Sequence, residues 1–471
     1  MARSAAAVRR VIKAYDVRGL VGADLDEALV REIGAVFAAL MRQEGARRMV
    51  IGQDMRDSSP GLASAFADGA ANQGLDVVRI GLAATDQLYF ASGVLDCPGA
   101  MFTASHNPAA YNGIKLCRAG AKPVGADTGL GRIRDQLIAG VPAYGGPPGK
   151  IGDRDVLDDY AVFLRSLVDL SGLRPLRVAV DAGNGMAGHT APAVFAPIAG
   201  ITVLPLYFDL DGNFPNHEAN PLDPANLADL QAYLKAGHAD VGLAFDGDAD
   251  RCFVVDEQGR PVSPSAVTAL VATRELQREA GATVIHNLIT SRAVPELVVE
   301  RGGTPVRSRV GHSYIKALMA DTGAIFGGEH SAHYYFRDFW GADSGMLAAL
   351  HVLSALGEQQ RPLSELVADY QRYASSGEIN YTVADASACV QAVLASFGAM
   401  VASVDRLDGV TVDLGDGSWF NLRSSNTEPL LRLNVEARCA EDVDAVVAQV
   451  GAEIAAHSDT PRTEARRSLD C

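Results

Sequence analysis

The sequence contains no apolar run long enough to cross a bilayer, and its N-terminal apolar stretch is too short and interrupted for a signal peptide. The six cysteines are scattered without a CxxC pair, which excludes a zinc ribbon and argues against a disulfide scaffold. Basic residues (41) are outnumbered by acidic ones (57), and the net charge of -16 disfavours nucleic acid as a partner. We therefore predict a cytoplasmic protein with reduced thiols and neither membrane nor nucleic-acid partners. A local cluster of Arg and Lys could still bind small phosphorylated molecules.

A short sequence pattern occurs three times, starting at Met49, Val178 and Thr283. Each copy has a β-branched run, a polar or glycine-rich turn, an amphipathic stretch, a glycine and a second β-branched run. This order is typical of a βαβ unit of about 30 residues, and such units build layered α/β domains. The chain has room for roughly three or four domains. We predict three related α/β domains in series.

Proline and glycine clusters mark the expected domain boundaries. The stretch 142–149 (PAYGGPPG) can sustain neither helix nor strand ladder, a weaker boundary lies at 258–261, and a third lies near 375–377. Beyond the last break a helix, two strands and a second helix are expected, which predicts an α+β domain. The predicted fold class is α/β, with three similar mixed α/β (βαβ-containing) domains plus a C-terminal α+β domain. The predicted domains are 1–150, 151–258, 259–374 and 375–471.

Asp246, Asp248 and Asp250 alternate with small residues in the loop DGDADR, directly after an apolar run. Three carboxylates at this spacing can converge on one hard cation, and oxygen ligands suit magnesium or calcium. A calcium EF-hand does not fit, because Arg251 stands at loop position six in place of glycine and strands flank the loop. The other interpretation is a solvated acidic turn. We favour a metal site, because clustered aspartates repel one another without a cation.

Ser105 lies in the segment TASHNP (103–108), where small and polar residues before Asn-Pro predict a turn with an outward hydroxyl. Taken alone, this segment is weak evidence, and an ordinary Asx turn is its better interpretation. No GxSxG motif surrounds Ser105, which argues against a serine hydrolase.

Glu329, Ser331 and His333 alternate in the segment GEHSAH (328–333). If the segment is extended, these three side chains face one side and can hydrogen-bond a polyhydroxylated ligand such as a sugar. Zinc is a rival ligand, but the two histidines lack the helical spacing of four residues.

Arg423 opens the segment RSSNTEP (423–429) between two predicted strands of the last domain. A guanidinium with hydroxyl, amide and turn N–H groups makes a suitable anion cradle. An ordinary polar hairpin is the alternative.

The turn of the second repeat, 183–188 (GNGMAG), matches the dinucleotide fingerprint G-x-G-x-x-G. The acidic residue about 20 positions on would be Asp209 or Asp211, but both lie beyond the next strand. We interpret the glycines as structural, since a βαβ turn requires them here.

The four loops in this order, with YDVRG at 15–19, resemble the α-D-phosphohexomutase family over residues 12 to 456. The resemblance implies four domains around a central cleft, each contributing one loop. Segments 331–338 and 425–427 look most like the phosphomannomutase / phosphoglucomutase branch, as in bacterial phosphomannomutases. His330 departs from the Met or Gln of many relatives, and the third repeat turn offers only His286 and Arg292 where some relatives carry a lysine.

The resemblance also implies residue roles. It implies that Ser105 is a phosphoserine and that a phosphate oxygen of Ser105 completes a magnesium site, one per chain, formed by Asp246, Asp248 and Asp250. The residues expected around the phosphoryl group are Arg18, His106, Lys115 and Arg251, with His333 and Lys115 as proton carriers. The residues expected to bind the sugar and its second phosphate are Glu329, Ser331, His333, His312, Arg423, Ser425, Asn426 and Thr427.

The implied reaction interconverts mannose 1-phosphate and mannose 6-phosphate through a phosphoserine enzyme and a hexose 1,6-bisphosphate, which also acts as activator, and it would supply GDP-mannose synthesis. A phosphoglucomutase or a dual-specificity phosphomannomutase/phosphoglucomutase is the alternative. A phosphoglucosamine mutase, a phosphosugar phosphatase and a calcium- or sugar-binding protein remain as further classes. The expected partners are small hexose phosphates, with the protein a monomer or homodimer.

Overall fold

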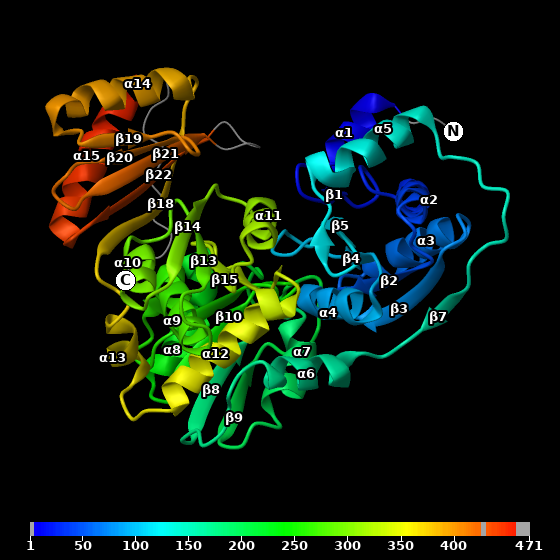
Figure 1. The fold of residues 1–471 in the computed structure, drawn as a ribbon, viewed down its shortest axis with the longest axis horizontal. Helices are drawn as coiled ribbons and strands as arrows, with labels where there is room; N and C mark the ends of the chain where they lie inside the picture. The colour runs from blue at the N-terminus through cyan, green and yellow to red at the C-terminus, as the bar shows by residue number, and fades with distance from the viewer. Residues whose placement is uncertain (1–3, 425–429, 458–471) are drawn as a thin grey trace.

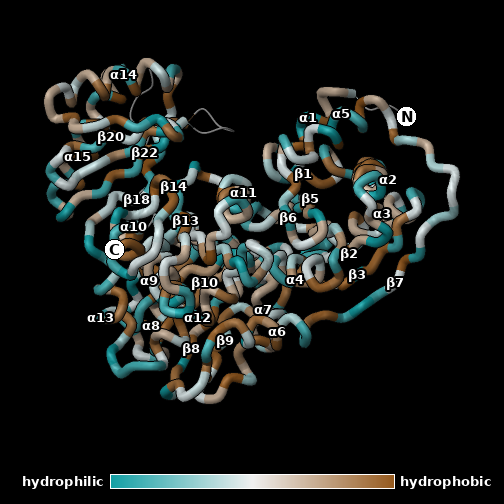
Figure 2. The backbone as a smooth tube through the Cα atoms, viewed as in Figure 1, coloured by the Kyte–Doolittle hydropathy of each residue, from teal (hydrophilic) through white to brown (hydrophobic). Residues whose placement is uncertain are grey.

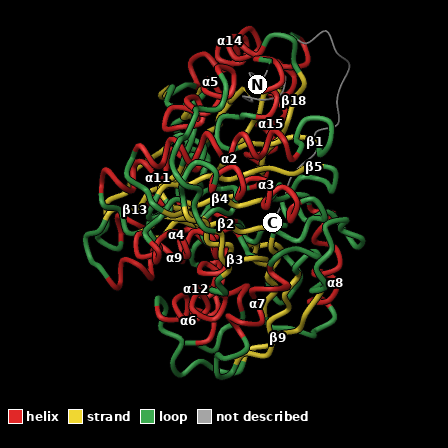
Figure 3. The backbone as a smooth tube through the Cα atoms, turned by 90° about the vertical axis from the view of Figure 1, so that its right-hand side faces the viewer, coloured by secondary structure: helices red, strands yellow, loops and turns green. Residues whose placement is uncertain are grey.

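The computed structural model describes residues 4–424 and 430–457, and Figure 1 shows four β-sheets, each with its own helices, following one another along the chain. In Figure 3 the helices lie against the strands of these sheets. We name the four parts units 1 to 4, after their sheets. Among the described residues, no helix combines the length and apolar character needed to span a membrane.

Unit 1 contains a sheet of seven strands with order β1-β5-β4-β2-β3-β7, and β6 pairs with β5. Its strands are β1 (Val17–Leu20), β2 (Arg48–Gln53), β3 (Asp76–Leu82), β4 (Gly99–Phe102), β5 (Tyr111–Arg118), β6 (Lys122–Pro123) and β7 (Ile151–Asp153). Its helices are α1 (Ala5–Val11), α2 (Glu27–Gln43), α3 (Ser59–Ala71), α4 (Thr85–Leu95) and α5 (Gly131–Ala139), with a π-helical turn at Ala126–Leu130.

Units 2 and 3 each contain a five-stranded sheet. Unit 2 has β8 (Leu176–Asp181), β9 (Ile201–Leu206), β10 (Val241–Phe245), β11 (Cys252–Val255) and β12 (Pro261–Val262), with α6 (Leu157–Ser166), α7 (Ala187–Phe195), α8 (Ala228–Lys235) and a short 3₁₀ helix (Pro224–Leu227). Unit 3 has β13 (Thr283–Asn287), β14 (Thr304–Ser308), β15 (Phe326–Gly328), β16 (Tyr334–Phe336) and β17 (Ala342–Asp343), with α9 (Pro264–Arg278), α10 (Ala293–Glu300), α11 (His312–Thr322), α12 (Gly345–Gly357), α13 (Leu363–Ala368) and a 3₁₀ turn (Arg337–Phe339).

The sheets of units 1 to 3 share one strand order: β5-β4-β2-β3, β11-β10-β8-β9 and β16-β15-β13-β14. In each, three strands are parallel and the fourth returns antiparallel. The predicted repeats form the first two parallel strands of each sheet. The third strand and its antiparallel neighbour are joined by residues 103–110, 246–251 and 329–333. The Ser105, aspartate and Glu329 loops are therefore equivalent positions of one repeated topology.

Unit 4 is an antiparallel sheet of order β18-β22-β21-β20-β19. Its elements are β18 (Ala374–Thr382), β19 (Ser403–Asp405), β20 (Val410–Asp413), β21 (Trp419–Ser424), β22 (Leu430–Ala437), α14 (Ala386–Phe397), α15 (Ala440–Ala456) and a 3₁₀ turn (Gly398–Met400). The three similar α/β units and the different last unit confirm the predicted fold class.

The observed ends of the sheets differ from the predicted domain boundaries by a few residues. The strand pairs show that Ile151–Asp153 completes the sheet of unit 1 and that Pro261–Val262 completes the sheet of unit 2. The expected boundary near 375–377 lies within β18, where the register shifts between Ser375 and Glu378 and Gly377 has a φ of 64°. Glycine adopts this conformation readily at a bulge, and in the sequence the same glycine resembled a break between domains.

One hydrophobic core joins units 2 and 3 with α4 and one face of the sheet of unit 1 (Val50, Ile80, Met101 and Cys117), whereas a second core lies within unit 1 and a third within unit 4. In Figure 2 the hydrophobic segments gather within the units, and hydrophilic segments lie along their outer loops. The shared core holds α4 against the aspartate loop, because it includes Leu88 and Phe90 of α4 and Phe245 and Ala249 of unit 2. Burial of such side chains stabilises by about 1.5–3 kcal/mol each.

Asp86 joins three units through one buried carboxylate. It accepts hydrogen bonds from Tyr160 Oη of α6 (2.8 Å) and from Ser344 Oγ, the N-cap of α12 (2.6 Å). Burial is the main cause that raises the pKa of Asp86 to about 7. These bonds fix the start of α4, where Thr85 contacts the aspartate loop.

The replacement Asp86→Asn is expected to change the pH dependence of stability. The folded protein keeps the proton of Asp86 up to about pH 7, whereas the unfolded chain releases it near pH 3.8. Wild-type stability from this group is therefore full below pH 3.8 and is lost as pH rises to 7. Between pH 5 and pH 8, the unfolding free energy of the variant relative to that of the wild type should therefore rise by about 2–3 kcal/mol. Urea unfolding at both pH values checks this; a difference independent of pH contradicts it.

Candidate active site

Ser105 lies at the start of the loop between β4 and β5, with its backbone in the left-handed region at a φ of 50°. Thr103 Oγ1 accepts from the backbone N–H of Ser105 (2.9 Å), which holds this turn. The Ser105 hydroxyl donates to Asp246 Oδ2 of unit 2 at 2.8 Å. The loop thus places the serine directly on the aspartate loop, which an ordinary Asx turn does not require.

Asp246, Asp248 and Asp250 are buried in the loop between β10 and β11, and one oxygen of each lies within 4.8 Å of the others. Within the described residues, no hydrogen-bond donor reaches Asp248 Oδ1 or Asp250 Oδ1. Buried carboxylate oxygens without a donor need another positive partner. The donor set is all oxygen, so the residues present fit a hard divalent cation.

Two groups of unit 1 reach into the aspartate loop. Thr85 Oγ1 donates to Asp248 Oδ2 (2.5 Å), and the Thr85 backbone N–H donates to the Asp248 carbonyl (3.0 Å). Lys115 of β5 forms ion pairs with Asp248 Oδ2 (2.7 Å) and with Asp250. Unit 1 therefore fixes both the serine and the geometry of the carboxylates.

The carboxylates of the loop have very different proton affinities. Burial and the charge of Asp248 raise the pKa of Asp250 to about 7. Burial also raises the pKa of Asp248, but Lys115 outweighs it and leaves this pKa below its usual value. Burial lowers the pKa of Lys115, yet Asp248 and Asp250 outweigh it and raise this pKa, so Lys115 carries its proton. A cation would relieve the repulsion between the two aspartates.

Close backbone packing explains the glycines of two loops. A Cβ at Gly247 would lie 2.4 Å from the Ser105 carbonyl oxygen, so only glycine allows the serine loop to approach. A Cβ at Gly185 would lie 2.8 Å from the Gly247 carbonyl oxygen, and the Met186 N–H donates to that same carbonyl. The GNGMAG turn therefore supports the aspartate loop from behind, in agreement with structural glycines.

The predicted basic residues gather around Ser105. Arg18 of β1 donates to the Ala104 carbonyl (2.5 Å) and to Asn107. Arg251 donates to Asp246 Oδ2 from Nε (2.9 Å) and to Nδ1 of His106 (2.6 Å). That His106 nitrogen lies 3.2 Å from Ser105 Oγ. Burial and the charges of Arg251 and Arg18 lower the pKa of His106 well below its usual value, so neutral His106 accepts from Arg251.

The segment 329–333 is not extended: it forms the tight turn between β15 and β16, where Ala332 has a φ of 63°. The condition under which Glu329, Ser331 and His333 would face one side is therefore not met. The Glu329 N–H donates to the His333 carbonyl (3.0 Å), so the two residues pair across the hairpin, and half-buried Ser331 lies in the turn. Glycine and polar residues made this turn resemble a strand end.

Glu329 is buried and held by protein donors. Its carboxylate accepts from Tyr335 Oη (2.5 Å), Asn287 Nδ2 (3.2 Å) and the Gly311 N–H (3.2 Å). Its orientation is thus fixed by unit 3 before any ligand binds.

His333 forms a row with Asp343 and Lys316. The sequence predicted a role for His333 but not for Asp343 or Lys316. Lys316 Nζ lies 2.7 Å from Asp343 Oδ1, and His333 Nδ1 lies 3.1 Å from Asp343 Oδ2. Burial lowers the pKa of His333, but the hydrogen bond to Asp343 outweighs it and raises this pKa. Burial raises the pKa of Asp343, but Lys316 outweighs it and holds this pKa well below its usual value. Asp343 and Lys316 belong to no recognisable sequence motif. The only hint of a role in the sequence is that each is a charged residue among mostly apolar neighbours.

One pocket brings together polar groups from units 1 to 3. It is lined by Tyr15, Lys115, Asp250, His312, Lys316, His333 and Asp343, among others. His312 lies at the start of α11 with its ring 5.0 Å from that of Tyr15. Burial is the main cause that lowers the pKa of His312 to about 3, so this imidazole is neutral near pH 7. The pocket therefore places His312 and His333 beside the aspartate loop.

Arg423 lies at the end of β21, buried, with its guanidinium 3.5 Å from Glu378 Oε2 of β18. Burial lowers the pKa of Arg423. The other residues of the predicted cradle, Ser425, Asn426 and Thr427, lie outside the described residues.

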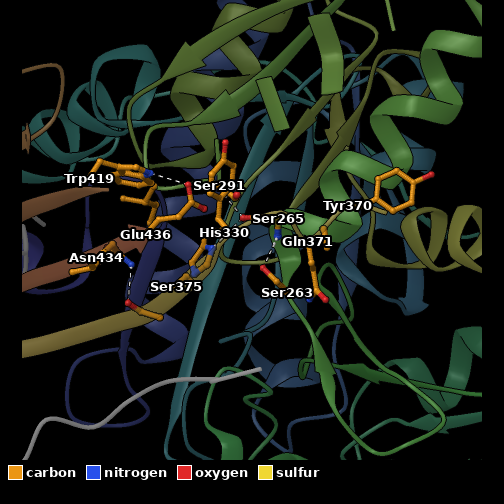
Figure 4. Close-up of a pocket in the computed structure, with 15 residues that line it drawn as sticks. Ser263, Ser265, Ser291, His330, Tyr370, Gln371, Ser375, Trp419, Asn434 and Glu436 are labelled. Atoms are coloured by element: carbon orange, nitrogen blue, oxygen red, sulfur yellow. Dashed lines mark hydrogen bonds between the residues drawn. The ribbon is translucent and has the colours of Figure 1, made fainter. Parts of the chain in front are cut away.

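A second pocket lies between units 3 and 4, and Figure 4 shows His330, Ser265 and Ser291 on one side and Trp419, Asn434 and Glu436 on the other. His330 therefore faces unit 4, and its Nδ1 lies 3.3 Å from Ser265 Oγ. The two residues of the third repeat turn have their contacts in units 3 and 4. His286 is buried in β13, and Arg292 forms an ion pair with Asp413 of unit 4 (2.6 Å).

Comparison with known proteins identifies the class. Models of the phosphoglucomutase/phosphomannomutase family match four consecutive parts: alpha/beta/alpha domains I (9–138), II (158–259) and III (263–373) and the C-terminal domain (378–453). The crystal structure of a phosphoglucomutase/phosphomannomutase family protein from Burkholderia thailandensis is similar, with a TM-score of 0.87 and 32% identity over 98% of this chain and 99% of that one. Fold and site thus define a phosphohexomutase-type enzyme.

Curated relatives give the family. A protein described as "Phosphohexose mutases" from Xanthomonas campestris pv. campestris is 43% identical, covering 90% of this chain and 94% of its own length. A phosphomannomutase from Salmonella typhimurium is 39% identical over the same shares. A phosphomannomutase/phosphoglucomutase from Pseudomonas aeruginosa is 36% identical over 93% of each chain. The chain belongs to the phosphoglucomutase/phosphomannomutase family.

Proposed function

We propose that this protein is a phosphomannomutase that interconverts mannose 1-phosphate and mannose 6-phosphate through a phosphorylated Ser105. The observation that carries the proposal is the 2.8 Å contact between Ser105 Oγ and Asp246 Oδ2, at the edge of three buried aspartates. The relatives named phosphomannomutase support the choice of sugar.

Asp246, Asp248 and Asp250 would hold one Mg²⁺, with a phosphate oxygen on Ser105 as a further ligand. When bound, the ion neutralises charge on the transferring phosphoryl group. Arg18, His106 and Arg251 surround the serine and orient it, and protonated Lys115 adds positive charge beside Asp248. Phosphoryl transfer depends chiefly on such alignment and charge neutralisation.

The transfer breaks the bond between Ser105 Oγ and phosphorus and forms a bond to the free hydroxyl of the bound hexose monophosphate. The proton of that hydroxyl passes to His333, whose Nε2 is left free by the bond between Nδ1 and Asp343. The 1,6-bisphosphate then reverses its orientation, and its other phosphate returns to Ser105. The same bisphosphate, supplied from outside, would activate unphosphorylated enzyme.

The sugar and its second phosphate need a separate site. Glu329, Ser331 and His312 would bind the hydroxyl groups, since unit 3 presents them beside His333. Arg423 with Ser425, Asn426 and Thr427 would bind the phosphate that is not transferred. A dual-specificity enzyme that also accepts glucose phosphates is the second candidate, favoured by the relative named phosphomannomutase/phosphoglucomutase.

Turnover and protein mass together test the proposal. Mannose 1-phosphate, glucose 1-phosphate and glucosamine 1-phosphate are supplied separately with Mg²⁺ and glucose 1,6-bisphosphate, and intact mass reports phosphate on Ser105. We expect isomerisation of mannose 1-phosphate and one added phosphate. Comparable turnover of glucose 1-phosphate selects dual specificity. Release of inorganic phosphate faster than isomerisation, or activity on glucosamine phosphate alone, contradicts the proposal.

The replacement Thr85→Val is expected to weaken metal binding. It keeps the shape of the side chain but removes the 2.5 Å hydrogen bond that orients Asp248. Loss of such a support typically lowers metal affinity by about 10- to 100-fold. In a titration of activity with Mg²⁺, the Mg²⁺ concentration that gives half-maximal activity should therefore rise by the same factor. The control Thr411→Val removes a hydroxyl that binds Asn421 in unit 4 and should leave the titration unchanged.

A further inference from the structure

Arg56 is a buried arginine that binds several backbone carbonyls of the serine loop and the first residue of β5. Its side chain is 1% exposed and lies in the turn after β2. Its Nη1 donates to the carbonyls of Pro108 (2.9 Å) and Tyr111 (3.1 Å), and its Nη2 donates to those of Ser105 (3.0 Å) and Asn107 (2.6 Å). Its Nε donates to Asp54 Oδ2 (3.2 Å). All five N–H groups of the guanidinium are therefore used.

Unit 2 covers this guanidinium. The ring of Phe214 lies 5.1 Å from Arg56 Cζ, which is within the range of a cation–π contact. Gly212 packs so closely that a Cβ there would lie 2.7 Å from Arg56 Cα. The guanidinium itself is thus shielded from water, and the carbonyls of the loop would lose these partners if it were absent.

The serine needs this support because its own backbone is strained. Ser105 adopts a φ of 50°, a conformation that non-glycine residues adopt only at an energetic cost. Two arginines hold this turn: Arg251 donates to the following residue, His106, and Arg56 donates to the carbonyl of Ser105. A lysine could not replace Arg56, because an ammonium has three donors and no planar fork.

We propose that Arg56 is the positioning residue of the reaction: it fixes the backbone of residues 105–111 so that Ser105 Oγ faces the aspartates. Arg56 touches no reacting atom and acts only through the loop. The proposal rests on the proposed function, since it takes Ser105 as the phosphate carrier.

The test compares Arg56→Lys with wild type in steady-state kinetics and in the rate at which glucose 1,6-bisphosphate phosphorylates the protein, read by intact mass. Misplacement of a reacting group typically lowers the rate by about a hundredfold, and we expect this loss in kcat with KM changed by less than about threefold. The matched control is Arg165→Lys, because Arg165 donates to the carbonyls of Ala193 (2.7 Å) and Val194 (3.2 Å) in unit 2. It should keep wild-type kcat.

Gly212→Ala supplies an independent variant, because it pushes on Arg56 from unit 2 and removes no donor; it should lower kcat in the same way. If Arg56→Lys does not fold, Gly212→Ala decides the question. Suppose that wild-type Ser105 carries phosphate. A folded variant that then keeps the kcat and the phosphorylation rate of the wild type overturns the inference. Absence of phosphate on wild-type Ser105 instead overturns the proposed function.

Discussion

Replacing Ser105 with alanine is expected to abolish mutase turnover, with a loss of about 10⁴-fold or more. The hydroxyl is the only atom of this side chain that can carry the phosphoryl group. The neighbouring Thr103 hydroxyl does not replace it, because it accepts from the Ser105 N–H (2.9 Å) and is committed to the turn. Turnover of mannose 1-phosphate and intact mass after incubation with glucose 1,6-bisphosphate provide the measurement.

Ser92→Ala is the matched control for this loss. Ser92 is also a buried serine of unit 1, and its hydroxyl donates to the Cys97 carbonyl (2.7 Å) away from the aspartate loop. It should keep its turnover and its added phosphate. Near wild-type isomerisation by Ser105→Ala would exclude Ser105 as the phosphate carrier, and continued release of inorganic phosphate by this variant would favour direct hydrolysis at the aspartate loop.

The fold could be predicted because its signals are local. The runs at Met49, Val178 and Thr283 each pair in parallel with the second strand of their own repeat. Hydrophobic strands and glycine turns close together in sequence therefore sufficed to predict three α/β units. The sequence-based boundaries placed the edge strands at 151–153 and 261–262 in the following domain. No local sequence pattern shows that a strand pairs with one that lies earlier in the chain.

The site was predictable only in part, for a physical reason. The aspartate loop shows its chemistry through spacing, whereas the supporting residues act across long sequence separations. Thr85 and Asp248 are 163 positions apart, and Arg56 reaches loop carbonyls that are 49 to 55 positions away. Arg56 binds the loop through backbone oxygen atoms, which are the same in every residue type and so give no signal in the sequence. Only the folded chain brings such pairs together.

The replacement Asp343→Asn is expected to lower kcat by about 10³- to 10⁴-fold, as loss of the carboxylate that orients a catalytic histidine does elsewhere. Asp343 Oδ2 accepts from Nδ1–H of His333 at 3.1 Å, which leaves Nε2 available to the substrate. An asparagine can donate its amide N–H to Nδ1 instead and then favours the wrong tautomer. The raised pKa of His333 depends on the same bond, so the variant histidine should also bind its proton less tightly.

The variant has a second effect that must be separated from the first. Lys316 is 4% exposed and would keep a buried charge without its 2.7 Å partner, which typically destabilises by about 3–5 kcal/mol. The double variant Asp343→Asn/Lys316→Met removes that charge and should recover most of the thermal stability. Its kcat should stay low, because the tautomer of His333 is still wrong. If kcat recovers together with stability, Asp343 serves the packing of unit 3 alone, and the proton must pass to a group other than His333.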